Sequence, residues 1–182
     1  MRIRTPDVSE MDAAQRAAYE AAVSGRRGHM PAPMRAWIQS PEFAQRAQHL
    51  GAFARYETSL PPRLSELAIL VTARCWTSHF EWYAHKKEAL AAGVSSAIID
   101  AIAQRARPLF EDEQSRVVHD YSLAMHETKK IADDLHRAAV AALGERGVVE
   151  LVGVLGYYSL VAMTLNAFEI GLPEGEVSDL AE

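Results

Sequence analysis

Apolar residues in this chain recur three and four positions apart, which is the spacing of one face of an α-helix. No stretch alternates apolar and polar residues with the two-residue period of a half-buried strand. We therefore expect an all-α fold. Helices are expected over residues 10–23, 34–39, 41–57, 63–76, 78–92, 96–104, 111–128, 133–143 and 147–169.

The ends of several helices carry recognisable signals. Ser9 is expected to cap the first helix, and Ser40 followed by Pro41 is expected to open the third. Gly93 and Gly144 are expected to end two later helices, because glycine readily adopts the left-handed conformation at a helix C-terminus.

Length and composition indicate one soluble globular domain covering residues 1–182. It divides into N-terminal helices (1–58), a motif core (60–105) and C-terminal helices (111–170). The net charge of −5, with 19 basic against 24 acidic residues, argues against nucleic acid as a partner. The N-terminus has no apolar run typical of a secretory signal, so we expect a cytoplasmic protein.

The most apolar segment, residues 151–165, is about 15 residues without a charge, too short to span a bilayer. We expect a core helix here and no membrane partner. The acidic tail from Pro173 is expected to be loose.

Residues 66–85, ELAILVTARCWTSHFEWYAH, hold the candidate chemistry. On a helix starting at Ser78, the side chains of Ser78, Glu81, Trp82 and His85 share one face. Ser78 and Glu81 also match a capping box, which alone would explain both residues. Glu66 lies among aliphatic residues, where a carboxylate needs a partner, and His85 on the next helix is the natural one. The sequence does not distinguish a purely structural pair of Glu66 and His85 from a catalytic one.

This segment resembles the carboxymuconolactone decarboxylase and alkylhydroperoxidase D superfamily. The peroxidase branch has a glutamate, a CxxC pair starting twelve residues later, and a histidine four residues after the second cysteine. Glu66 and His85 keep that register, and Ser78 and Glu81 replace the cysteines. The resemblance is to a long-chain branch without the CxxC cysteines, and it implies an alkylhydroperoxidase D-like helical bundle that assembles into a dimer, trimer or hexamer.

The single cysteine, Cys75, precludes an internal disulfide, and it does not fit the peroxidase motif. If Cys75 and Ser78 were a degenerate CxxC pair, Trp82 would stand at the histidine position and Arg63 at the glutamate position. The resemblance therefore points away from peroxide chemistry. Two alternatives stay open, namely a peroxidase that uses Cys75 with an external thiol, and a non-catalytic oligomer that binds a small ligand.

For the decarboxylase branch, the resemblance implies cofactor-free loss of carbon dioxide from a carboxylated lactone or related organic acid in aromatic catabolism. His85 would carry the proton, Glu66 would orient His85, and Glu81 would assist. We expect the substrate to contact the site-lining residues Ser78, Trp82 and Tyr83. The substrate's carboxylate needs a cation, and the candidates are Arg74, Arg55 and Arg63.

We expect no cofactor and no metal ion. Three histidines on the C-terminal side of the motif, His119, His126 and His136, lack the spacing of paired metal ligands on a helix and stand among charged residues. We expect these three on a solvated surface.

Overall fold

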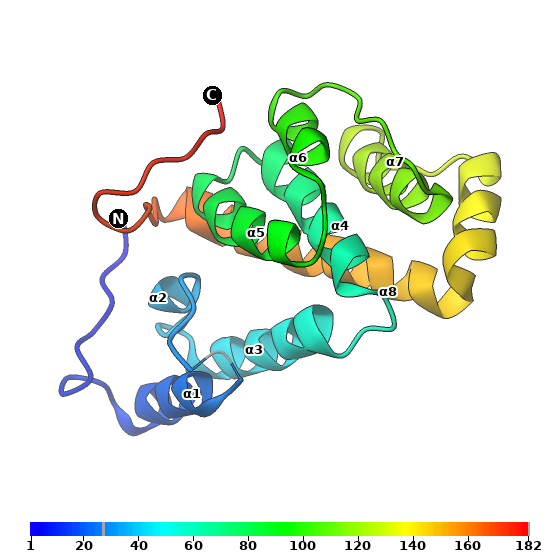
Figure 1. Cartoon of the computed structure of the whole chain (residues 1–182). Coiled ribbons are helices and arrows are strands. Elements are labelled where there is room, and N and C mark those ends of the chain that lie inside the picture. Colours follow the sequence, from blue (N-terminus) through cyan, green and yellow to red (C-terminus); the bar gives the residue numbers. More distant parts are fainter. Residues whose placement is uncertain (27, 182) are drawn as a thin grey trace.

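The computed structural model describes residues 1–26 and 28–181, and every regular element in this part of the chain is a helix (Figure 1). The all-α prediction is confirmed. The elements are α1 (Ala13–Ser24), α2 (Met34–Trp37), α3 (Pro41–Tyr56), α4 (Pro62–Cys75), α5 (His79–Ala91), α6 (Ser96–Ala103), α7 (Glu113–Glu127) and α8 (Asp133–Ala167).

Helix α8 crosses the middle of the molecule, with α1–α3 on one side and α5–α7 on the other (Figure 1). It packs against α3, α4, α5 and α7. Two helices were expected here, and Gly144 does interrupt the helical geometry with a φ of +72°. By length and composition α8 could cross a membrane, but 61% of its most apolar window is buried inside the protein, as in a core helix.

Helix α4 is buried on all sides, since every residue from 64 to 74 is buried. Its aliphatic residues pack against α5, α7 and α8, and each fully buried leucine or isoleucine contributes about 1.5–3 kcal/mol. The polar residues Glu66, Thr72 and Arg74 are buried with them. Helix α4 therefore carries polar groups into the centre of the protein.

The helix caps differ from the prediction at the N-terminus. Asp12, not Ser9, caps α1, because its carboxylate accepts from the Gln15 amide at 2.8 Å while the Gln15 side chain accepts from the Asp12 amide at 3.1 Å. Ser40 stands at the N-cap of α3 without a side-chain capping bond. The expected stop at Gly93 is confirmed, with a φ of +92° directly after α5.

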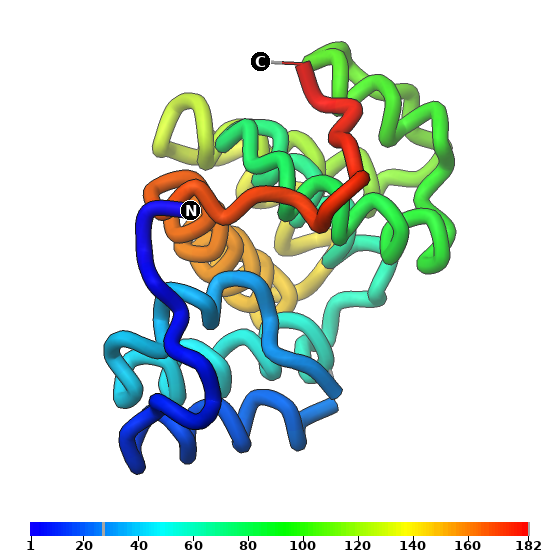
Figure 2. The backbone as a smooth tube through the Cα atoms, turned by 90° about the vertical axis from the view of Figure 1, so that its left-hand side faces the viewer, coloured from blue at the N-terminus to red at the C-terminus, as the bar shows by residue number. Residues whose placement is uncertain are grey.

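The C-terminal tail, expected to be loose, is bound to α5. Asp179 accepts from the Trp82 indole at 2.6 Å and also pairs with Lys86, while Leu180 is buried. In Figure 2 the tail runs alongside the segment that contains α5 and α6. The prediction failed because an acidic composition does not reveal a specific acceptor for a distant indole.

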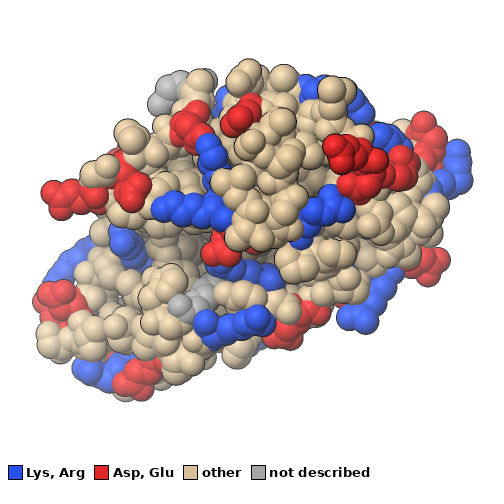
Figure 3. Space-filling view, in the orientation of Figure 1, with Lys and Arg blue, Asp and Glu red and all other residues tan. Residues whose placement is uncertain are grey.

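The histidines outside the motif do not all lie on a solvated surface. His119 is 4% exposed and contacts Asp120 at 3.0 Å, and His126 is half-buried with its Nε2 atom 2.9 Å from the Thr72 hydroxyl. Only His136 of the three is exposed. On the face seen in Figure 3, basic and acidic side chains are interspersed, without the basic stripe typical of a nucleic-acid site.

Gly51 provides the space in which α3 and α8 approach each other. A Cβ atom at this position would overlap the hydroxyl group of Tyr157. We expect Gly51→Ala to lower the free energy of unfolding by about 1–3 kcal/mol, because overpacking forces side chains to shift. Urea denaturation measures the change.

The control is Gly171→Ala, at an exposed position after α8 where the new Cβ meets no atom within 4 Å. This substitution should be neutral or stabilise by up to about 1 kcal/mol, because alanine has less conformational freedom than glycine in the unfolded chain. Equal destabilisation by both substitutions would show that the contact with Tyr157 is not responsible.

Candidate functional site

The expected pair of Glu66 and His85 forms across two neighbouring helices. Glu66 on α4 places its Oε2 atom 2.7 Å from Nδ1 of His85 on α5, and both side chains are about nine-tenths buried. The aliphatic neighbours of Glu66 on α4 are buried as well. A carboxylate that accepts from Nδ1–H holds the imidazole in one orientation and leaves Nε2 for other chemistry.

Glu81 lies one helical turn before His85 and is 2% exposed. Within the described residues, neither of its carboxyl oxygens has a hydrogen-bond partner. Burial raises the pKa of Glu81 well above the ordinary value of 4.5, which favours the neutral carboxylic acid over the carboxylate. A neutral acid can donate a hydrogen bond or a proton at a site where a carboxylate could only accept.

The capping box expected at Ser78 and Glu81 is absent. Ser78 stands at the N-cap of α5, but its side chain makes no capping bond, and its buried hydroxyl has no partner among the described atoms. The Ser78 amide instead donates to Ala73 in the turn that ends α4. Capping therefore does not explain Glu81.

His85 and Glu81 line a pocket of about 100 Å³ that opens between the N-terminal segment and α5 and α8. Tyr158 from α8 lies edge-on to the His85 ring, with the ring centroids 4.8 Å apart. Arg55 from α3 is the cation among the described lining residues, and its guanidinium is 3.1 Å from the Glu88 carboxylate. Glu66 does not line the pocket, because it lies behind His85.

The other residues expected to bind substrate lie elsewhere. Trp82 is fully buried, and its indole donates to Asp179 of the tail. Tyr83 is half-buried and its hydroxyl accepts from Lys87 at 2.8 Å. Arg74 lines a different pocket, which contains Cys75. Helical periodicity predicted that Trp82 and His85 share one face of α5. That face is wide, so His85 contacts the pocket while Trp82 contacts the C-terminal tail.

Sequence reasoning missed three residues that line the pocket. His29 comes from the loop before α2, and Tyr157 and Tyr158 come from α8, more than 70 residues after His85. The uncharged stretch of α8 predicted burial. The two tyrosines within it indicated a polar contact, because a buried tyrosine hydroxyl usually has a hydrogen-bond partner. Of the three arginines considered, Arg63 pairs with Asp112 at the N-cap of α7, and Arg55 is the one that lines the pocket.

The site combines an oriented imidazole, a buried carboxyl group with a raised pKa and a guanidinium around a small cavity. Among residues 1–26 and 28–181, no three histidine, cysteine or acidic side chains are grouped as metal ligands. Cys75 is nine residues from Glu66, which places it on the opposite face of α4. The pocket therefore offers proton transfer without a sulfur nucleophile.

Comparisons with known proteins concern the family and the fold. Residues 41–118 match the model of the carboxymuconolactone decarboxylase family, and no curated protein matches the chain. Among solved structures, an AhpD-core, peroxidase-related protein from Ralstonia eutropha superposes with a TM-score of 0.77 at 11% identity, covering 95% of this chain and 92% of its own. A peroxidase-related protein from Silicibacter gives 0.76 at 15% identity, covering 97% and 93%.

A protein of unknown function from Agrobacterium tumefaciens, assigned to antioxidant defence as an AhpD protein, gives a TM-score of 0.66 at 20% identity. It covers 75% of this chain and 94% of its own. Identities this low establish the fold alone. The resemblance found in the sequence is thus confirmed: residues 41–118 match the carboxymuconolactone decarboxylase family, and the chain has the helical fold of AhpD-like proteins.

Proposed function

We propose that this chain is a cytoplasmic, homo-oligomeric lyase that decarboxylates a small carboxylated lactone or related organic acid without a cofactor. The observation that carries the proposal is the buried contact between Glu66 and His85 beside the neutral carboxyl group of Glu81. Together these groups supply a proton carrier, a group that orients it, and a hydrogen-bond donor. These are the requirements of a reaction that passes through an enolate.

In the proposed step, the bond between the substrate carbon and its carboxylate breaks and carbon dioxide leaves. The electron pair passes into the conjugated carbonyl group and forms an enolate. The carboxylic acid of Glu81 donates a hydrogen bond to the enolate oxygen, as a neutral acid in an apolar site can. His85 takes part in this step as the imidazolium, with Nδ1–H bonded to Glu66, and it donates the proton on Nε2 to the enolate carbon. The ring is left protonated on Nδ1 alone and takes up a new proton on Nε2 from solvent.

Arg55 is the group we assign to the substrate's carboxylate. Its side chain is 21% exposed and lies at the pocket, so the guanidinium is held near the reacting groups. The ion pair with Glu88 partly neutralises the positive charge of Arg55. Arg55 therefore binds the substrate's carboxylate without strongly stabilising its charge. Weak stabilisation suits a reaction in which the carboxylate must lose its charge.

The peroxidase alternative depends on Cys75, and the environment of that thiol weighs against it. Burial, as the largest cause, raises the pKa of Cys75, which reduces the fraction present as the nucleophilic thiolate. Cys75 also lines a pocket that shares no residue with the pocket of His85 and Glu81. A reaction at the sulfur would not use these two groups.

The exposed face of α8 supports assembly into an oligomer. Val149, Val152 and Met163 recur along this face and are 72%, 43% and 51% exposed. Gly153 and Gly156 lie between them on the same exposed face and would allow another helix to approach closely. A contiguous apolar helix face of this kind typically marks a protein–protein contact.

The first test is turnover of carboxylated lactones and β-keto acids, followed by carbon dioxide release and ultraviolet absorbance. We expect His85→Gln to lower kcat/KM by about 100-fold or more, because general acid–base catalysis typically accelerates a reaction by at least that factor. Glu66→Gln should lower it by about tenfold, as the imidazole loses its orientation. The matched control is His136→Gln at the exposed histidine of α8, which should retain full activity.

A parallel peroxide-consumption assay tests the alternative. Cys75→Ser should leave lactone turnover unchanged. If no lactone or keto acid reacts, and peroxide is consumed only while Cys75 is present, the decarboxylase proposal is wrong.

The protonation of Glu81 predicts a pH dependence of stability. Because its folded pKa is raised, the folded protein holds a proton that the unfolded chain releases above pH 4.5. This contribution to stability is complete below pH 4.5 and is lost as pH rises toward the folded pKa, at up to about 1.4 kcal/mol per pH unit. Urea denaturation from pH 5 to pH 8 should therefore show Glu81→Gln gaining stability relative to the wild type as pH rises.

Glu20→Gln, on the exposed surface of α1, is the control for removing one acidic group. Its difference from the wild type should stay constant over the same range. A constant difference for Glu81→Gln as well would mean that Glu81 is ionised in the folded protein.

The oligomer can be tested at the exposed face of α8. Sedimentation velocity should give the wild type a mass of at least two chains, and Val152→Glu should give a single chain, since a buried unpaired charge is costly. Val177→Glu is the control, because Val177 is 86% exposed on the tail. A monomeric wild type would contradict the assembly without affecting the proposed chemistry.

A further inference from the structure

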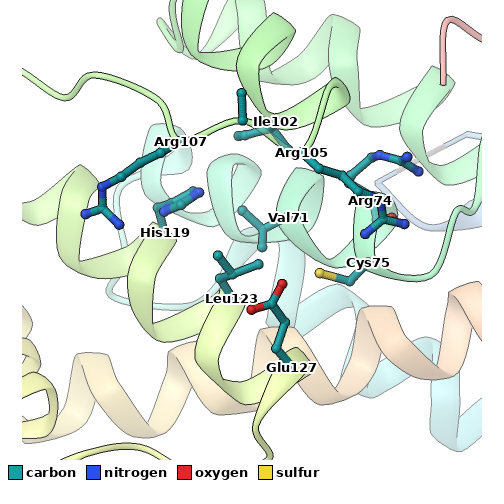
Figure 4. Close-up of a pocket in the computed structure, with 10 residues that line it drawn as sticks. Val71, Arg74, Cys75, Ile102, Arg105, Arg107, His119, Leu123 and Glu127 are labelled. Atoms are coloured by element: carbon teal, nitrogen blue, oxygen red, sulfur yellow. The ribbon is translucent and has the colours of Figure 1, made fainter. Parts of the chain in front are cut away.

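A second pocket, of about 160 Å³, lies between α4, α6 and α7 and does not contain any residue of the His85 pocket (Figure 4). Its walls include the apolar side chains of Val71, Ile102 and Leu123. Two guanidinium groups, those of Arg74 and Arg105, lie next to each other at one end. The proposed decarboxylation does not use this pocket.

Arg74 is an unusual residue to bury. It is 5% exposed, and its Nε atom has no hydrogen-bond partner among the described residues. Its Nη1 atom donates to the Thr77 hydroxyl at 3.1 Å. No carboxylate in the described chain lies within ion-pair distance of Arg74. A buried cation without a counter-ion costs several kcal/mol, so this position needs an explanation beyond packing.

Arg105 brings a second positive charge to the same place. Its Nη2 atom is 3.4 Å from the Thr77 hydroxyl and 3.5 Å from the Arg74 carbonyl oxygen, and within the described chain it too has no carboxylate partner. Burial first, and the charge of Arg105 second, lower the pKa of Arg74. Both Thr77 and Arg105 have left-handed backbone conformations, with φ of 45° and 56°, that such residues seldom adopt.

Capping of α4 explains only part of this arrangement. The last carbonyls of a helix attract cations, and the contact from Arg105 to the Arg74 carbonyl is of that kind. It does not provide a partner for the Arg74 guanidinium. The left-handed residues Thr77 and Arg105 lie in the turns that end α4 and α6, and these turns bring an exposed guanidinium beside a buried one. Two like charges this close repel each other, and a bound anion would offset the repulsion.

The remaining charged groups of the pocket limit what that anion can be. Arg107 points away from the other two arginines and is neutralised by Asp120 at 2.9 Å (Figure 4). Glu127 also lines the pocket, and its charge disfavours a ligand that is anionic throughout. The ligand should therefore carry one anionic end and an apolar body.

We propose that this pocket is a binding site for a small monocarboxylate, whose carboxylate lies against Arg74 and Arg105 and whose apolar body lies against Val71, Ile102 and Leu123. The planar fork of a guanidinium matches a carboxylate in geometry and charge. The size also fits, because an engineered cavity of about 150 Å³ binds benzene. A benzoate-sized acid is the natural probe.

Calorimetric titration of the full-length protein with sodium benzoate tests the site. Arg105→Met should weaken binding by about tenfold or more, the worth of a charge-assisted hydrogen bond. Arg74→Lys keeps the charge without the fork and should also weaken binding. Glu127→Gln should strengthen binding, because it removes a like charge from the pocket.

Two controls locate the binding. Arg137→Met removes an exposed arginine of α8 and should have no effect, and His85→Gln should also leave binding at this site intact. Bound benzoate should slow alkylation of Cys75 by iodoacetamide, because the thiol lines the pocket. Inorganic phosphate should compete weakly, as its second charge faces Glu127.

The proposal is overturned if benzoate does not bind saturably, or if it binds Arg105→Met as tightly as the wild type. Binding that is lost in His85→Gln and kept in Arg105→Met would place benzoate in the other pocket and would also overturn it. Failure of the decarboxylation assay would not affect either result.

Discussion

The contact between Glu66 and His85 is the interaction on which the rest of the site depends. It joins α4 to α5 at 2.7 Å inside an apolar environment, where each group would be costly alone. Because Glu66 accepts a hydrogen bond from Nδ1 of His85, the other ring nitrogen, Nε2, is left to transfer protons in the pocket. Glu81 and Tyr158 line the same small pocket as His85.

Helix α4 organises both pockets because it is buried all around. Residues nine positions apart lie on opposite faces of a helix, so Glu66 and Cys75 face different parts of the protein. One face supplies the partner of His85, and the C-terminal end supplies Arg74 with the strained turn at Thr77. Burying a carboxylate and a guanidinium in one helix lowers stability, which is the usual cost of a functional position.

Much of the fold and the central pair could be predicted from sequence, because they depend on local rules. Helical periodicity gave the all-α fold, and a carboxylate among aliphatic residues required a partner such as His85. Contacts between distant segments could not be predicted. Trp82 shares a face with His85 yet binds Asp179 in the tail, and Arg55 reaches the pocket from a helix with no motif. Sequence spacing does not determine which side of a wide helix face meets which neighbour.

The most direct test of the central contact is the tautomer of His85, observed in long-range ¹⁵N–¹H correlation spectra at alkaline pH, with His85→Gln assigning its signals among the seven histidines. If Glu66 accepts from Nδ1–H, the neutral ring carries its proton on Nδ1, and Glu66→Gln shifts the population toward the other tautomer. A wild-type ring protonated on Nε2, unchanged by Glu66→Gln, would show that Glu66 does not orient the imidazole and would contradict the proposed role of the pair.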